Sequence, residues 1–172
     1  MKKPGTWWTR FYLSVMFWVT GRAIQAAGRR DRELRTLFSQ FPEDFSFCLS
    51  VWPAGPELHI IRDKDNILRY KRTPEDTPPA LHMEITASAH AMALFTFAES
   101  TSLAAARGRL VTRGRLSDTC TMIQVLDRVE TYLLPRFIAA RAVKRHESPP
   151  YKHRVRAAVW LGVFTSRGAA RP

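Results

Sequence analysis

The fold is decided by LHMEITASAHAMALFTFAESTSLAAARGRLVTRGRLSDTCTMIQVLDRVETYLL, residues 81–134. Residues 81–86 alternate apolar and polar side chains, and residues 88–99 form a compact apolar segment. Residues 108–114 alternate again between two glycines, and from Ser117 the apolar residues recur at helical spacing. A period of two is typical of a strand, and a period of about 3.6 is typical of a helix. The pattern therefore predicts strand, helix, short helix, strand and long amphipathic helix.

The long helix is predicted over residues 117–145, with one apolar and one polar face. Its apolar face carries Met122, Leu126, Val129 and Leu133. The opposite face is assigned Asp118, Thr121, Gln124, Arg128 and Thr131. Because an amphipathic helix buries its apolar side, we expect this helix to pack across one face of a sheet.

Three more strands and a helix are predicted ahead of this stretch. The strands lie at residues 45–50, 58–61 and 67–71, separated by loop-forming residues. A helix begins after Asp31, a typical N-cap residue, and ends before Pro42. With the two strands described above, the chain has five predicted strands.

The order of these segments resembles the sterol carrier protein type 2 (SCP2-like) lipid-binding domain family. In that family an alternating strand precedes a helix opened by Ser or Asp, an Ala-rich helical turn, and a Gly-basic-Leu strand that closes at a second glycine. The counterparts here are residues 83–86, 88–97, 102–106 and 108–114. Bacterial accessory factors of ubiquinone biosynthesis, which form one branch of this family, carry a strand and a following helix that are similar to the Arg-Leu-Val strand and long helix of this chain.

The resemblance implies an α+β fold, with a five-stranded, largely antiparallel sheet covered by helices and with helical N- and C-terminal extensions. It also implies a cavity for a hydrophobic ligand between the long helix and the preceding segment. The implied ligand-binding residues are Leu94, Phe95, Phe97, Leu103, Leu110, Met122, Leu126, Val129 and Leu133. Helical spacing alone favours a closed hydrophobic core made by these residues, so both alternatives stay open.

Charge divides the 172 residues into a nearly neutral centre and two basic ends. Residues 1–35 carry a net charge of +6, residues 36–135 carry −2, and residues 136–172 carry +8. We therefore expect a helical N-terminal extension (1–42) that associates with membranes, an SCP2-like lipid-binding domain (43–145), and a basic amphipathic C-terminal tail (146–172). Basic ends favour an anionic membrane surface as a partner and a cytoplasmic location peripheral to the membrane.

The N-terminal apolar run, residues 11–19, is too short to cross a bilayer, which requires about twenty residues. Trp7, Trp8 and Trp18 are unusual in a cleaved signal peptide, so a retained helix is favoured over one. That helix either packs on the domain or lies in the membrane interface, where tryptophan rings are common. The two alternatives are equally supported by the sequence.

The motifs, histidines and cysteines carry little sign of catalysis or metal binding. GxSxG, GxGxxG, HExxH and phosphate-loop motifs are absent from the sequence, and the five histidines show no ligand spacing. His90 with Glu84 or Glu99 would be an acid–base pair, but a structural histidine is favoured. Cys48 and Cys120 are interpreted as buried small hydrophobic residues. No enzyme activity, catalytic residue, metal site or cofactor is predicted.

Three classes of function remain. The favoured one is non-enzymatic binding or carriage of a hydrophobic lipid at a membrane surface, with an isoprenoid quinone intermediate of ubiquinone biosynthesis as the ligand that the resemblance implies. The second is a basic nucleic-acid-binding protein, which rests on the pI of about 10.6 alone and is therefore disfavoured. The third is a scaffold subunit that binds other proteins of a membrane-associated biosynthetic complex.

Overall fold

The computed structural model describes residues 5–73 and 77–133 and Leu161. The elements are α1 (Gly5–Gly28), α2 (Arg32–Phe38), β1 (Ser46–Val51), β2 (Glu57–Arg62), β3 (Leu68–Lys71), β4 (Leu81–Ile85), α3 (Ser88–Phe95), α4 (Thr101–Ala106), β5 (Leu110–Arg113) and α5 (Leu116–Leu133). The predicted order of strands and helices is confirmed. The predicted continuation of the long helix over residues 134–145 lies outside the described residues, as does the tail apart from Leu161.

The five strands form one sheet in the order β3-β2-β1-β4-β5. Only the β1–β4 pair is parallel, and the other three pairs are antiparallel. The predicted α+β fold with a largely antiparallel five-stranded sheet is therefore confirmed. β1 is the central strand, and its Leu49 lies opposite Leu58 of β2 and Met83 of β4.

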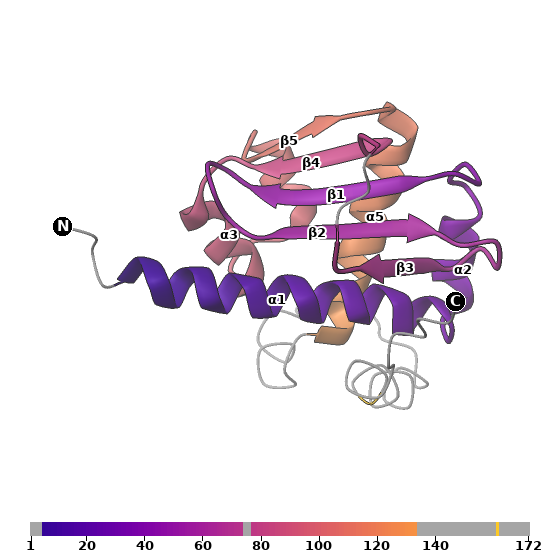
Figure 1. Cartoon of the computed structure of the whole chain (residues 1–172), viewed down its shortest axis with the longest axis horizontal. Coiled ribbons are helices and arrows are strands. Elements are labelled where there is room, and N and C mark those ends of the chain that lie inside the picture. The colour runs from indigo at the N-terminus through magenta and orange to yellow at the C-terminus, as the bar shows by residue number, and fades with distance from the viewer. Residues whose placement is uncertain (1–4, 74–76, 134–160, 162–172) are drawn as a thin grey trace.

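The hydrophobic core fills the space between one face of the sheet and α5. Figure 1 shows α5 crossing behind the strands while α1 runs along the β3 edge. Phe47, Leu49 and Val51 are buried on β1, at alternate positions that share one face of a strand. Ser46, Cys48 and Ser50 therefore project from the opposite face, which is the sheet's outer face.

The C-terminal half of α1 packs closely against the sheet edge. A Cβ atom at Gly21 would lie 2.5 Å from Tyr70 Cδ2 and 2.6 Å from Leu58 Cδ1, so only glycine fits this contact. Ala23 and Ile24 are fully buried in the same region. Among the described residues, no helix has both the length and the hydropathy that crossing a bilayer requires.

A buried hydrogen-bonded group joins the α1–α2 junction to α5. Asp31 caps α2 by accepting a hydrogen bond from the Glu33 N–H at 2.9 Å, as the sequence predicts. Its Oδ2 also accepts hydrogen bonds from Arg128 Nε (2.5 Å) and from the Tyr132 hydroxyl (2.6 Å). Burial acts to raise the pKa of Asp31, but the bonds from Arg128 and Tyr132 outweigh it and hold that pKa below its usual value. The group fixes the C-terminal half of α5 against the helices before the sheet.

Three side chains of α5 differ from the sequence interpretation. Cys120 is exposed, because it lies two residues, or about 200°, from the buried Met122. Asp118 is buried, since it lies one turn before Met122 on the same side of the helix. Thr121 is also buried, and its hydroxyl donates to Gln40 Oε1 at 3.2 Å. Cys48, by contrast, is buried as expected.

Candidate functional site

A small cavity of about 30 Å³ lies where α5 meets the sheet and the α3–α4 segment. Its walls come from α1, β1, β4, β5, α5 and the segment that runs from α3 into α4. It is lined by Thr20, Leu49, Ile85, Leu94, Phe95, Phe97, Thr101, Leu110, Leu126, Val129, Glu130 and Leu133. The lining is apolar except for Thr20, Thr101 and Glu130.

Most of the residues that the sequence implies for a ligand site meet at this cavity. Those that line it are Leu94, Phe95, Phe97, Leu110, Leu126, Val129 and Leu133. Met122 is fully buried but outside the lining, and Leu103 is 41% exposed. Leu103 faces outward because the short helix α4 instead buries Thr101 and Ala104. The role of these residues in ligand binding stays a prediction.

Sequence reasoning missed the polar members of the lining. Thr20 comes from α1, nearly 100 residues before α5 begins, so only the folded chain brings it to the site. Glu130 could have been found, because it lies four residues after Leu126 and three before Leu133. That spacing places Glu130 on the apolar side of α5.

Among the described residues that line the cavity, Glu130 is the one with an ionisable side chain. The hydroxyl of Thr101 donates a hydrogen bond to its Oε1 at 2.5 Å. Burial raises the pKa of Glu130 to about 7, a shift that the Thr101 bond opposes and the charge of Asp127 increases. Near neutral pH this carboxyl group therefore exists in both forms, and its protonated form donates as well as accepts a hydrogen bond.

The wall formed by the α3–α4 segment is built from short elements. α3 has eight residues and α4 has six, and Phe97 between them has a φ of 60°. A left-handed backbone is unusual for a bulky residue and costs about 1–3 kcal/mol, so surrounding contacts must hold it. Nearby, Glu99 accepts bonds from Arg107 (2.8 Å) and Arg109 (2.7 Å).

α1 adds two further contacts to this segment. The Tyr12 hydroxyl donates to the Phe95 carbonyl at 2.8 Å, and the rings of Phe17 and Phe95 have centroids 5.0 Å apart. The segment is therefore held by these polar bonds and ring contacts together with the buried side chains of Ala91, Leu94 and Ala104. Such an arrangement can open more easily than the sheet, whose strands share continuous ladders of hydrogen bonds.

The geometry favours a structural role for His90 over an acid–base pair with Glu99. His90 Nδ1 is hydrogen-bonded to the Thr86 hydroxyl at 2.9 Å. Glu99 is instead paired with Arg107 and Arg109, which lower its pKa although burial acts to raise it. His90 thus has the partner expected of a structural histidine.

Comparison with known proteins gives no matching family model and no matching curated protein. Among solved structures, the chain is similar to a UbiJ-SCP2 ubiquinone synthesis protein, at 13% identity and a TM-score of 0.46, covering 76% of this chain and 98% of that one. Sterol carrier protein 2 from Yarrowia lipolytica, in its apo form, has 13% identity and a TM-score of 0.44, with coverage of 70% and 93%. Sterol carrier protein domain 2 of Helicoverpa armigera has 14% identity and a TM-score of 0.44, with coverage of 73% and 87%. All three solved structures are described as sterol carrier protein 2 proteins or domains, and each likeness is distant.

Proposed function

We propose that this chain binds and carries a hydrophobic lipid that has a hydrogen-bonding head group, without catalysing a reaction. The observation that carries the proposal is an apolar cavity with Glu130 and two threonines in its wall. A partly buried carboxyl group with a pKa near 7 costs folding free energy, because its charged form is poorly solvated. Proteins keep a destabilising side chain mainly where it has a function, and we therefore attribute Glu130 in the cavity wall to ligand binding.

The cavity volume of about 30 Å³ is close to that of a single water molecule, whereas ligand sites span about 300–1,000 Å³. Binding therefore requires the α3–α4 segment to move away from α5. The ligand supplies the free energy, since each Å² of apolar surface removed from water contributes about 25 cal/mol. A chain that buries about 400 Å² gains about 10 kcal/mol, which offsets the loss of the hydrogen bonds that α4 makes with α5, from Thr101 to Glu130 and from Ser102 to Asp127.

The polar wall narrows the chemistry of the ligand. Glu130, Thr101 and Thr20 together can donate and accept hydrogen bonds, so they suit a head group with hydroxyl or carbonyl oxygens. Isoprenoid quinone intermediates of ubiquinone biosynthesis have a head-group ring with hydroxyl or carbonyl oxygens, joined to a long apolar chain. They are therefore the ligand class that we propose.

A fluorescence titration tests this function with two probes, a pyrene-labelled long-chain alcohol and the corresponding pyrene-labelled alkane. We expect the alcohol to bind saturably at one molecule per chain, and more tightly than the alkane, because only the alcohol can bond to Glu130. A signal that rises without saturation for both probes would reflect partitioning onto the surface, and would contradict a defined site.

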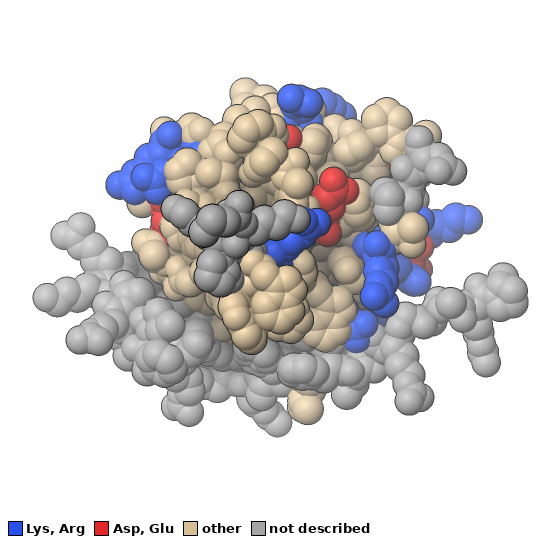
Figure 2. Space-filling view, turned by 60° about the vertical axis from the view of Figure 1, so that its left-hand side comes forward, with Lys and Arg blue, Asp and Glu red and all other residues tan. Residues whose placement is uncertain are grey.

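We further propose that the chain acts as a peripheral membrane protein in the cytoplasm, docking through the start of α1. Trp7 and Trp8 are 63% and 65% exposed, and Phe11 beside them is also exposed. Their rings form one cluster, with Trp7 and Trp8 centroids 4.7 Å apart and Trp7 and Phe11 stacked at 5.9 Å. Figure 2, in which the left-hand side of Figure 1 comes forward, shows Lys and Arg side chains at several places on this side, with fewer Asp and Glu side chains among them. Exposed tryptophans beside basic residues suit the interface of an anionic membrane.

Flotation with phosphatidylcholine–phosphatidylglycerol vesicles tests the docking surface. The double variant Trp7→Ser, Trp8→Ser is expected to float several-fold less than the unmodified protein, because the inserted rings supply apolar burial that salt does not screen. Leu116→Ser is the matched control, since it removes an exposed apolar side chain at the start of α5. Equal flotation of the double variant and the control would show that α1 is not the membrane contact.

A further inference from the structure

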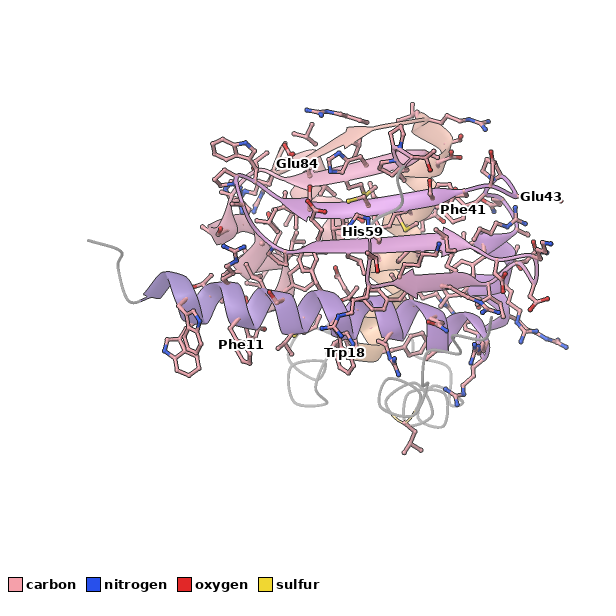
Figure 3. All side chains as sticks on the ribbon, viewed as in Figure 1. Phe11, Trp18, Phe41, Glu43, His59 and Glu84 are labelled. Carbon is pink, nitrogen blue, oxygen red and sulfur yellow. The ribbon has the colours of Figure 1, made fainter. Side chains whose placement is uncertain are left out.

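The outer face of the sheet brings three metal-ligating side chains into one row. Cys48 of β1 is paired with His59 of β2 in the antiparallel register and with His82 of β4 in the parallel register. These three residues are scattered along the sequence, and only the strand order makes them neighbours. Figure 3 shows His59 on the sheet face turned toward the viewer, whereas α5 lies behind the sheet. The row is therefore separated from the cavity by the sheet itself.

Glu57 completes a tight group on this face. Its Oε2 lies 3.1 Å from His59 Nε2, and the Cys48 sulfur, the Glu57 carboxylate and the His59 ring nitrogen all lie within 4.8 Å of one another. Residue Cys48 is 5% exposed, whereas the side chains of His59 and Glu57 are 18% and 56% exposed. The group thus has a buried sulfur at its base and a carboxylate open to solvent, which gives an ion a path to all three ligands.

We infer that Cys48, Glu57 and His59 bind a divalent transition-metal ion, with Zn²⁺ as the ion that this ligand set fits best. Zn²⁺ accepts sulfur, imidazole nitrogen and carboxylate oxygen in tetrahedral sites, at bond lengths of about 2.0–2.3 Å. Those lengths place ligand atoms about 3.3–3.6 Å apart, which the 3.1 Å between Glu57 and His59 already approaches. Cys48, within 4.8 Å of both, closes the triangle with a small rotation of its side chain.

Three protein ligands leave the fourth position of a tetrahedral ion open. His82 is the next side chain in the row, and its Nε2 is hydrogen-bonded to the Ser50 hydroxyl at 2.8 Å. In this arrangement His82 and Ser50 border the open position, where a water molecule completes the coordination. Burial and the charge of Glu57 raise the pKa of Cys48 to about 12, so the thiol holds its proton until the ion displaces it, and the proton leaves to solvent as the sulfur–metal bond forms.

The test uses the full-length protein, freed of metal by dialysis against a chelator and titrated with Co²⁺, whose near-ultraviolet absorption reports thiolate ligation. We expect one equivalent of Co²⁺ to bind with a thiolate band that added Zn²⁺ abolishes. Cys48→Ser should remove the band, whereas the control Cys120→Ser, at the exposed cysteine of α5, should keep it. Absence of a band from the unmodified protein, or its survival in Cys48→Ser, overturns the inference.

A second pair of variants decides the question if Cys48→Ser does not fold. Glu57→Gln replaces a mostly exposed carboxylate and should lower Co²⁺ affinity by about tenfold or more. Glu84→Gln is the matched control, because Glu84 lies across Ser50 from Glu57 on the same sheet face but outside the group. Equal effects of the two changes would show general attraction of the cation to surface carboxylates, and would overturn the site.

Discussion

Replacing Asp31 with alanine is expected to lower the free energy of unfolding by about 3–5 kcal/mol. The change leaves the buried Tyr132 hydroxyl and the partly buried Arg128 guanidinium, both bonded to Asp31 Oδ2, without that acceptor. It also removes the N-cap of α2, which contributes about 1 kcal/mol in typical cases. Urea denaturation followed by circular dichroism measures the effect as a shift in midpoint at constant slope.

Glu33→Gln is the matched control for this prediction. Glu33 also pairs with Arg128, but its side chain is mostly exposed, so its loss should cost no more than about 1 kcal/mol. Similar losses from the two changes would mean that the buried group does not fix α5.

The Asp31 group should also make stability depend on pH. Because its folded-state pKa is held below the unfolded value, Asp31 stabilises the protein fully above the unfolded pKa of about 3.9. This contribution is lost as the pH falls through the lower folded-state pKa. In Asp31→Ala this loss of stability below a pH of about 4 should disappear. If the free energy of unfolding of the variant falls at acid pH as much as that of the unmodified protein, Asp31 is not the cause of the pH dependence.

Local periodicity was sufficient to predict most of the fold. The alternation in β1 and β4, the N-cap at Asp31 and the 3.6-residue spacing of α5 each depend on side chains close together in the chain. The errors at Asp118 and Cys120 arose from assigning residues to helix faces by polarity, although their angular distance from Met122 gives the correct sides.

The candidate sites could be predicted only in part, because they depend on pairing between distant segments. The α5 residues of the cavity follow from helical spacing, but Thr20 reaches it only through the packing of α1 on the sheet. Cys48 and His59 become neighbours through strand register, which the spacing of cysteines and histidines in the sequence does not reveal. Arg128 and Asp31 likewise meet across 97 residues of chain.

Val129→Phe is expected to abolish lipid binding while leaving a folded protein. Val129 is fully buried in α5 and lines the cavity, so a larger side chain there occupies the space that the ligand needs. Overpacking a core typically costs about 1–3 kcal/mol, and the existing cavity accommodates part of the added volume. Val125→Phe is the matched control, because Val125 is equally buried one turn earlier but outside the lining. It should cost at least as much stability and keep its lipid.

The central claim is that this chain carries a lipid in the cavity between α5 and the sheet. Mass spectrometry of organic extracts from the purified proteins tests it most directly. Unmodified protein and Val125→Phe should each release a hydrophobic molecule with hydroxyl or carbonyl groups, at close to one per chain, and Val129→Phe should release none. An unmodified protein without lipid, or equal amounts of lipid from the two phenylalanine variants, would contradict the claim.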